Sequence, residues 1–433
     1  MAKIVFIGGN LSVNKGGAAL ILSAYESIKS IIPDTEFIVV SYFIEDIQME
    51  KRYPEIEILP ELKKNFPLSR IISWGYYLFL AIYLKYIKLD LNRKLVKETI
   101  IKTYLDADLI IEISGDGLSG DYGILSTLHS LIRIHIGILL DKKVFIYAQS
   151  IGPFNIKWPQ TKIHSSFLSF ICKFYAKFLL NRVSLITVRE VISAELLKNM
   201  KVSKVPIYIT ADSAFLLRPI SKKDTFDILS KYGINDKEEI IGISLSNSIS
   251  RLQYFDSNTG SMKINQYEQI MLEVIKYITN QFNLKVVLVP HVTGPGEIND
   301  DRIIANKIIE KLTNKTHVVN ISEELTPDEL KGIIGTCKLF IGSRMHANIA
   351  AISMYVPTLA IGYSHKTNGI MEMAGQKEFI FNFKELNLDV IIKKIDEIWK
   401  EKETISKELK ENIQPLKKKS FYNVVQVKKL LDL

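Results

Sequence analysis

Residues 337–366 read CKLFIGSRMHANIAAISMYVPTLAIGYSHK. The run Lys338–Ile341 is short and apolar, as expected of a strand buried on both faces, and Gly342-Ser343 predicts a turn directly after it. A helix is expected from Arg344, and Thr358–Ile361 is a second apolar strand. A strand–helix–strand unit of this kind is the building block of parallel sheets with right-handed crossovers.

The same alternation of strands and helices extends over most of the chain. Toward the N-terminus we expect a strand at 3–7, a Gly/Asn loop at 8–17, a helix at about 18–31, and strands at 36–41, 108–114, 144–149, 185–188 and 208–211. Toward the C-terminus we expect strands at 240–245, 285–289 and 316–320, with helices at about 267–281, 300–312 and 327–335. These two series predict an α/β protein with two Rossmann-like domains facing across a cleft, residues 1–215 and 216–385. A charged helical tail, residues 386–433, follows, with Pro415 as its one interruption.

Composition limits the class of protein. Of 433 residues, 47% are hydrophobic and 24% charged, which excludes a disordered or fibrous chain. Cys172 and Cys337 lie far apart, so a disulfide framework and a cysteine zinc site are excluded. The start, MAKIVFIGGN, lacks the charged region and cleavage site of a signal peptide, and we expect a cytoplasmic protein.

The net charge of +9 is concentrated in part of the first half. Residues 141–205 contain eleven Lys and Arg against three carboxylates, and residues 60–105 contain nine against three. This favours an anionic partner such as phosphate, nucleic acid or a lipid surface, although a solvated basic face gives the same pattern.

Two apolar segments raise the question of membrane contact. Ile71–Leu84 has 14 uncharged residues, fewer than the roughly 20 that span a bilayer. This segment contains aromatic residues of the types that favour the headgroup level, and basic residues lie beside them. The aromatic residues are Trp74, Tyr76, Tyr77, Tyr83 and Tyr86, and the basic residues are Lys63, Lys64, Arg70, Lys85 and Lys88. In the second segment Phe167, Phe170, Phe174 and Phe178 recur at helical spacing with Lys173 and Lys177 between them. Two interpretations stay open: buried amphipathic helices, or peripheral attachment to an anionic membrane.

Ligands of open α/β sheets bind beyond the carboxyl ends of the strands, so polar residues directly after strands are candidates. These are Gly8-Gly9-Asn10, Ser114-Gly115-Asp116, Gln149-Ser150, His291, Gly342-Ser343-Arg344 and Tyr363. With Ser343 as N-cap, Arg344 and His346 occupy the first helical turn, where backbone N–H groups and the helix dipole favour phosphate. Arg344 could grip it through two hydrogen bonds. The alternative is that Arg344 pairs with a carboxylate and His346 fills a cap.

Other candidates are weaker. Arg189 directly follows a short strand but precedes Glu190, which also fits an ordinary surface pair. Asp116 and Asp121 come after a predicted strand. They could orient the hydroxyl groups of a substrate, or they could be ordinary turn residues. The N-terminal glycine-rich loop matches neither GxGxxG nor GxxxxGK[ST], and HExxH and GxSxG do not occur, so we expect no metal and no cofactor.

The order of segments resembles the polysaccharide pyruvyl transferases. The segments are GGN…NKGG, ADLIIEISGDGLSGDYG, AQSIGPF, TVRE, ADSAFLL and LFIGSRMHANIAAISMYVPTLAIGYSHK, spread over residues 3 to about 375. The resemblance implies a two-domain GT-B-like enzyme that moves the enolpyruvyl group of phosphoenolpyruvate, as co-substrate, onto a saccharide and forms a cyclic pyruvate ketal in cell-surface polysaccharide biosynthesis.

By this resemblance the C-terminal domain holds the donor and the N-terminal domain the acceptor. The implied catalytic residues are His346 and Arg344, the donor-binding residues also include Arg189, Ser343 and Lys366, and the acceptor-side residues are Asn10, Asn14, Asp116 and Asp121. Two departures from the family pattern fall on the acceptor side: Gly17 stands where an acid is usual, and Asp116 where a glycine is usual.

The donor-site residues predict a mechanism, and the basic aromatic segment predicts a place of action. Protonated His346 would protonate the methylene carbon of the donor, a sugar hydroxyl would attack the resulting centre, and a second hydroxyl would close the ketal as phosphate leaves. The acceptor could be lipid-linked, with the enzyme at the inner face of the cell membrane, and we expect no nucleic acid partner. The alternatives are a GT-B glycosyltransferase that uses a nucleotide sugar, and a non-catalytic GT-B-like scaffold in polysaccharide assembly.

Overall fold

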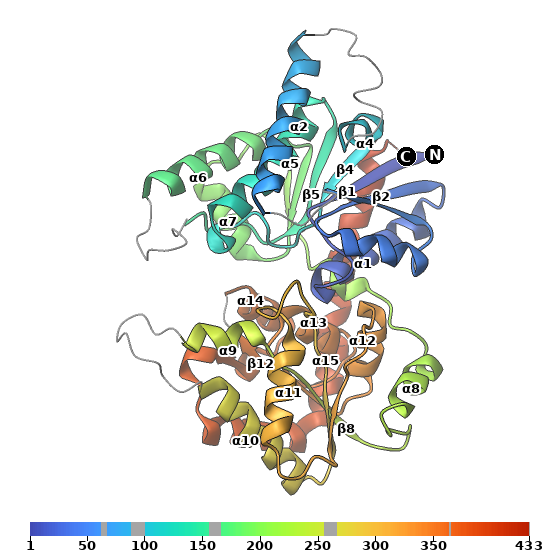
Figure 1. The fold of residues 1–433 in the computed structure, drawn as a ribbon, viewed down its shortest axis with the longest axis vertical. Coiled ribbons are helices and arrows are strands. Elements are labelled where there is room, and N and C mark those ends of the chain that lie inside the picture. Colours follow the sequence, from blue (N-terminus) through green and yellow to red (C-terminus); the bar gives the residue numbers. More distant parts are fainter. Residues whose placement is uncertain (62–66, 88–99, 156–165, 255–265, 363–364, 433) are drawn as a thin grey trace. The chain divides into compact units, whose positions relative to one another are not determined.

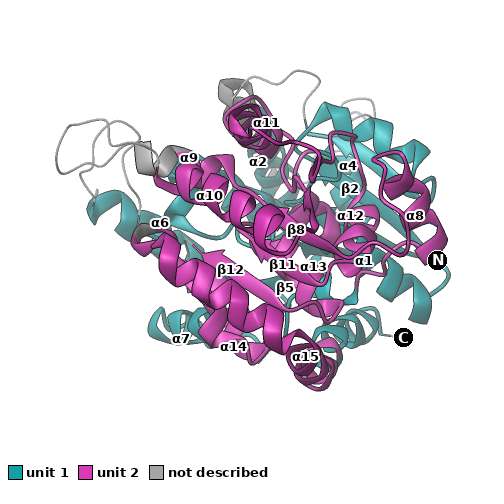
Figure 2. Ribbon diagram, turned by 90° about the horizontal axis from the view of Figure 1, so that it is seen from below, with its two compact units in different colours: residues 1–12, 20–216, 418–433 teal, residues 13–19, 217–417 magenta. Residues whose placement is uncertain are grey.

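The computed structural model describes residues 1–61, 67–87, 100–155, 166–254, 266–362 and 365–432. They form two compact units, coloured separately in Figure 2. Unit 1 comprises residues 1–12, 20–216 and 418–433, and unit 2 comprises residues 13–19 and 217–417. The chain passes from unit 1 to unit 2 at residues 216–217, beside the predicted boundary. Two short segments, residues 13–19 and 418–433, belong to a different unit from the residues next to them in sequence.

Unit 1 is built on a parallel sheet. Within its described residues the sheet has seven strands in the order β3-β2-β1-β4-β5-β6-β7. The strands are β1 (Ala2–Ile7), β2 (Thr35–Ser41), β3 (Ile56–Pro60), β4 (Leu109–Glu112), β5 (Lys143–Gln149), β6 (Leu185–Val188) and β7 (Ile207–Ile209). Continuous apolar runs produce the central strands; in β5 every residue after Lys143 is buried. The order reverses between β1 and β4, which is where such sheets bind ligands.

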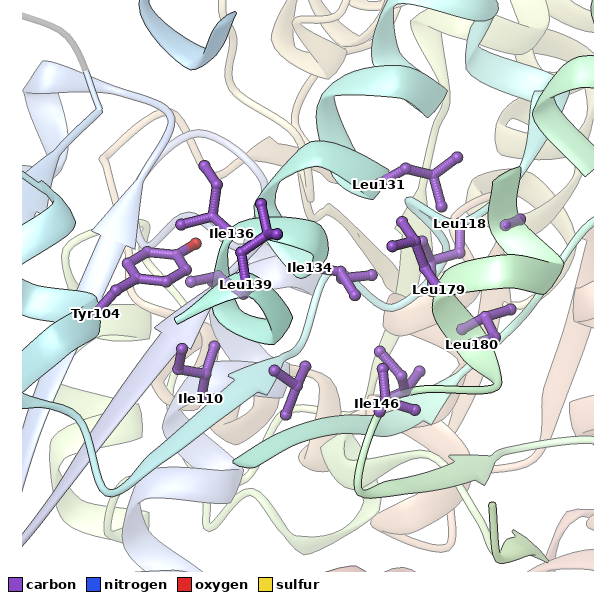
Figure 3. Close-up of a cluster of buried hydrophobic side chains, with 14 of the residues drawn as sticks. Tyr104, Ile110, Leu118, Leu131, Ile134, Ile136, Leu139, Ile146, Leu179 and Leu180 are labelled. Atoms are coloured by element: carbon purple, nitrogen blue, oxygen red, sulfur yellow. The ribbon is translucent and has the colours of Figure 1, made fainter. Parts of the chain in front are cut away.

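Helices cover both faces of this sheet (Figure 1). They are α1 (Lys15–Ile31), α2 (Pro67–Ile87), α4 (Ile100–Asp106), α5 (Ile124–Leu139), α6 (Ser166–Leu180) and α7 (Val191–Asn199), with 3₁₀ turns η1 (Ile44–Lys51), η2 (Gly120–Tyr122) and η3 (Ser213–Leu216). Figure 3 shows how Leu131 and Ile134 of α5, Ile146 of β5 and Leu179 and Leu180 of α6 gather in one apolar cluster. This cluster fixes which side of α6 faces the core.

A buried polar network crosses the same unit. Glu61 accepts hydrogen bonds from the Trp74 indole (3.2 Å) and from Arg133 (3.2 Å), and His129 Nε2 lies 3.1 Å from its carboxylate. Burial opposes ionisation of Glu61, but His129, Arg133 and Trp74 outweigh it and lower the pKa of this carboxyl. Trp74 is thus a core residue, so for this side chain the buried alternative holds and the headgroup-level one does not. Lys63, Lys64 and Lys88 lie outside the described residues.

Unit 2 repeats the architecture. Its described residues form a six-stranded parallel sheet in the order β10-β9-β8-β11-β12-β13. The elements are α8 (Lys222–Ser230), β8 (Ile240–Ser244), α9 (Asn247–Tyr254), α10 (Gln266–Gln281), β9 (Lys285–Leu288), α11 (Asp301–Lys311), β10 (Val318–Asn320), α12 (Pro327–Gly335), β11 (Leu339–Gly342), α13 (Met345–Ser353), β12 (Thr358–Gly362), α14 (His365–Met373), η4 (Lys377–Phe379), β13 (Ile380–Asn382) and η5 (Phe383–Glu385). The predicted class, two parallel α/β domains, is confirmed.

The predicted C-terminal tail is one helix, α15 (Leu388–Leu430), which runs through Pro415 without interruption. Its earlier part belongs to unit 2 and its end to unit 1, where Val424 and Val427 are fully buried and Asn423 accepts a hydrogen bond from Thr210 (2.9 Å). Among the described residues, no helix has both the length and the apolar character needed to cross a membrane.

Candidate functional site

The start of α13 carries the residues that the sequence marks most strongly. β11 ends at Gly342, and the N-cap of α13 is Arg344, whose side chain does not cap the helix. Ser343, which was predicted to be the N-cap, instead lies one residue before the N-cap, and its hydroxyl accepts a hydrogen bond from Tyr267 (2.7 Å). A Cβ at Gly342 would collide with the side chain of Asn348, which donates to the Gly342 carbonyl (3.1 Å), so glycine lets Asn348 pack against this turn. A helix start whose N-cap residue does not cap it is suited to an anion.

Arg344 is held in place by a buried carboxylate. Its Nε and Nη2 donate to the two oxygens of Asp301 (3.0 and 2.6 Å). The backbone N–H groups of Asn247 and Val292 also donate to Asp301, each at 3.0 Å. Burial raises the pKa of Asp301, and the Arg344 charge opposes that shift. The pairing foreseen as the alternative for Arg344 thus exists, and it fixes the direction of the guanidinium.

The N-terminus of α1 lies against the same site in unit 2. The helix begins at Lys15, earlier than predicted, because the Asn14 side chain accepts hydrogen bonds from the N–H groups of Gly16 (3.0 Å) and Gly17 (3.4 Å). Gly16 and Gly17 are therefore helical and not part of a loop. A Cβ at Gly16 would collide with the His346 ring, so the helix can approach His346 only with glycine at this position. Asn14, predicted with Asn10 on the N-terminal side, belongs to unit 2.

Lys15 brings a further buried cation. Its side chain is 2% exposed and pairs with Glu324, and its backbone N–H donates to the carbonyl of His291 (3.1 Å). The pairing joins residues 309 positions apart in the chain. Lys15, Asp301 and Glu324 were not identified from the sequence, because no local motif signals partners so distant.

His291 occupies the centre of this cationic group. It is buried, and neither ring nitrogen has a hydrogen-bond partner among the described residues. Burial, followed by the charges of His346, Arg344 and Lys15, lowers the pKa of His291 well below its ordinary value. A neutral imidazole with open nitrogens is thus available next to His346.

This shift predicts a pH dependence of stability. In the unfolded chain His291 takes up a proton below about pH 6.5, whereas the folded protein keeps it neutral, so stability is lost as the pH falls through that value. We expect His291→Asn to reduce the loss of urea resistance between pH 7.5 and 5.5, by up to about 1.4 kcal/mol for each pH unit below 6.5. An unchanged loss in the variant would contradict this assignment.

Lys366, the remaining residue predicted for the donor site, is the second residue of α14 and is 4% exposed. α14 follows β12, which pairs with β11 in parallel, so both helices begin at the same edge of the sheet. Tyr363 lies outside the described residues. Unit 2 therefore brings together Ser343, Arg344, His346 and Asn14 around His291 and Lys15.

Arg189 lies in unit 1, directly after β6. It is fully buried: Nε donates to Ser150 (2.7 Å), Nη1 pairs with Asp212, and Nη2 has no partner within the described residues. Because Arg189 is buried, it does not form an exposed surface pair with Glu190, which was the alternative interpretation of the sequence. Its one open amino group could bind an anion, while Asp212 fixes its orientation.

The carboxylates predicted for the acceptor lie in the same unit. Asp116 is half-buried and accepts a hydrogen bond from Tyr122 (2.7 Å), and Asp121 is exposed in η2. Asn10 is half-buried in a loop whose next two N–H groups donate to the buried Asp46 (2.6 and 2.9 Å). No group of three or more His, Cys, Asp or Glu suited to a metal ion occurs in the described part of the chain.

Known proteins resemble the chain at two levels. Solved structures of similar fold include a UDP-GlcNAc 2-epimerase from Neisseria meningitidis bound to UDP-GlcNAc (TM-score 0.59, 10% identity, all of both chains). Another is Alr3699/HepE from Anabaena in complex with UDP and glucose (TM-score 0.55, 14% identity, all of both chains). These identities establish a GT-B-like fold and no activity.

The sequence comparisons are more specific. The amylovoran biosynthesis protein AmsJ from Erwinia amylovora is 24% identical over 419 residues, 94% of each chain. The family model described as polysaccharide pyruvyl transferase matches residues 14–365, from the N-cap of α1 to the start of α14. With α13 carrying Arg344 and His346 inside that range, the chain belongs to the polysaccharide pyruvyl transferase family.

Proposed function

We propose that this protein transfers the enolpyruvyl group of phosphoenolpyruvate to a saccharide and closes a cyclic pyruvate ketal in the biosynthesis of a cell-surface polysaccharide. Membership of the family supports a transferase of polysaccharide synthesis. The AmsJ relative, named for amylovoran biosynthesis, supports an exopolysaccharide as the product. The donor and the ketal chemistry are the proposal.

The observation that carries the proposal is the start of α13. Phosphoenolpyruvate has a phosphate and a carboxylate, and the N-cap residue of this helix, Arg344, does not cap it and has its guanidinium fixed by Asp301. Lys15 adds a buried positive charge. Both cations are paired with carboxylates, Arg344 with Asp301 and Lys15 with Glu324, so the preference for a dianion over a neutral sugar rests on the dipole of the helix start.

The proposed reaction needs one proton donor and two hydroxyl groups. Protonated His346 gives a proton to the methylene carbon, which becomes the methyl group of the ketal. The first hydroxyl attacks the neighbouring carbon and loses its proton, the bond to phosphate breaks, and the second hydroxyl adds at the same carbon and loses its proton. One phosphate is released per ketal. Neutral His291 is suited to accept a proton from one of the hydroxyls.

The proposal is tested by phosphate release from phosphoenolpyruvate in the presence and absence of a saccharide acceptor. Release that depends on the acceptor, with a product heavier by one pyruvate less one water, is the expected result. Thermal protection by UDP or another nucleotide diphosphate, without protection by phosphoenolpyruvate, would favour the nucleotide-sugar glycosyltransferase instead. Binding of neither would favour a non-catalytic scaffold.

Arg344→Ala is expected to weaken donor binding by about 2–4 kcal/mol, because a charge-assisted contact between the guanidinium and the donor is lost. Arg344→Lys keeps the charge that balances Asp301 but loses the planar fork, so it should recover only part of the affinity. Isothermal titration with phosphoenolpyruvate measures both.

A matched control separates this effect from a general loss of charge. Lys285 is the first residue of β9, so it lies at the amino ends of the strands in unit 2, away from the carboxyl ends that carry the site. It pairs with Glu238 (2.9 Å). Lys285→Ala should bind the donor as the wild type does. Wild-type affinity in Arg344→Ala would remove Arg344 from the donor site.

A further inference from the structure

One face of α6 is unusually apolar for a surface. Its inner side, with Cys172, Ala176, Leu179 and Leu180, is buried in the core. The outer side exposes four phenylalanines at helical spacing, which we call the α6 aromatic face: Phe167 (71% exposed), Phe170 (67%), Phe174 (63%) and Phe178 (38%). A helix with only one buried side does not need aromatic residues on the other, so this face indicates a binding surface.

The neighbouring helices also expose apolar side chains. α5 packs against both α2 and α6, and the three can be followed in Figure 1. Their exposed apolar side chains are Tyr76, Phe79, Ile82 and Tyr86 on α2, Leu125 on α5 and Ile171 on α6. The segment 71–86 thus buries Trp74 but presents its other side to solvent.

The charges on these helices select the partner. Over their described ranges α2, α5 and α6 contain no Asp or Glu. Lys173 and Lys177 lie between the phenylalanines and form no ion pair with a described residue, and Arg182 stacks on Phe178 at 3.7 Å. Lys85 pairs with Asp141 (2.5 Å), and Glu195 of α7 lines a groove with Phe170 and Lys173.

From these features we infer that the α6 aromatic face binds the surface of an anionic lipid bilayer. The phenylalanines would enter the boundary between headgroups and acyl chains while Lys173 and Lys177 contact anionic headgroups, as in other interfacial helices. A protein partner would ordinarily be met by mixed charges, whereas α6 itself carries lysines and no carboxylate over its described range, with Glu195 of α7 as the one acid among the described residues of the groove beside Phe170, and this excess of positive charge complements anionic lipid. This inference goes beyond the proposed chemistry and does not depend on it.

The test is co-sedimentation of the full chain, without donor or acceptor, with vesicles of phosphatidylglycerol or of phosphatidylcholine. We expect binding to phosphatidylglycerol at low salt, its loss at about 1 M salt, where the Debye length is about 3 Å, and no binding to phosphatidylcholine. Phe170→Ser with Phe174→Ser should weaken binding about tenfold or more. Lys173→Gln and Lys177→Gln should each weaken it about fivefold.

Matched variants keep the result specific to this face. Ile298 in unit 2 is 58% exposed, and Ile298→Ser should bind vesicles as the wild type does. The emission of a tryptophan introduced by Phe170→Trp should shift to the blue with phosphatidylglycerol vesicles, and one introduced by Ile298→Trp should not shift. Because all these side chains are exposed, the melting temperature and the acceptor-dependent phosphate release should stay unchanged.

Two outcomes would overturn the inference. Equal binding to both kinds of vesicle, or to neither, would exclude an anionic bilayer as the partner. Self-association in sedimentation velocity that Phe170→Ser with Phe174→Ser abolishes, without vesicle binding, would assign the face to a second copy of the chain. Either outcome leaves the proposed chemistry unaffected, since phosphate release is measured without lipid.

Discussion

His346→Ala is expected to lower turnover by about 10²–10⁴-fold while donor affinity changes only severalfold. The reason is that His346 is proposed to supply the proton of the first step, and a positioned proton donor contributes about this factor. Steady-state kinetics of phosphate release with a saturating acceptor would measure kcat and KM separately. Near-wild-type turnover in His346→Ala would end the general-acid role. His317→Ala, which changes a histidine in the loop before β10, is the control and should keep full activity.

A second variant, Gly16→Ala, is expected to displace the His346 ring without removing it. Alanine is ordinarily better than glycine inside a helix by about 1 kcal/mol, so Gly16→Ala should not harm α1 itself. Its methyl group would, however, occupy the position of the His346 ring. We therefore expect Gly16→Ala to lower kcat in the same direction as His346→Ala. Unchanged kcat would show that the ring position is not critical.

Arg189→Met is expected to reduce the free energy of unfolding by about 3–5 kcal/mol, because it leaves the carboxylate of Asp212 buried without its partner. Urea titration followed by circular dichroism measures the change. Arg52→Met, at an exposed arginine of the same unit, should change stability by no more than about 0.5 kcal/mol. A similarly small change in Arg189→Met would mean that the pair contributes little.

The double variant separates stability from donor binding. Replacing both members of a buried pair by apolar residues is often neutral, so Arg189→Met with Asp212→Leu should recover most of the lost stability. If Arg189 also contributes to donor binding, as the family resemblance implies, the double variant should bind phosphoenolpyruvate less tightly than the wild type does. Recovery of donor binding together with stability would make Arg189 a structural residue only.

The elements that the sequence predicted well are those with strong local signals. Val144–Gln149 is a continuous apolar run and became β5 nearly unchanged. The start of α12 is marked by a capping box of Thr326 and Glu329 and by Pro327 as its first residue. The edge strands β3 and β13 were not predicted. They are short and partly exposed, so their residues carry little apolar pattern.

In the candidate site, too, the residues with local sequence signals could be predicted and their distant partners could not. Arg344 and His346 could be found because they follow a buried strand, a signal that lies within a few residues. The partner of Arg344 is Asp301, 43 positions away, and only the folded sheet brings the two together. The two sides of α2 are both apolar, so composition could not tell that Trp74 faces Glu61 while Phe79 faces solvent.

The exchange of segments between the two units has a consequence for the growing chain. Residues 13–19 are synthesised early, but the backbone partners of Val13 and Lys15 are Thr293 and His291, which leave the ribosome much later. Unit 1 in turn lacks Asn423, Val424 and Val427 until translation is nearly finished. Domains usually fold one after another during synthesis, starting from the N-terminus. Here neither unit can be completed, and the site around His346 cannot close, before almost the whole protein has been made.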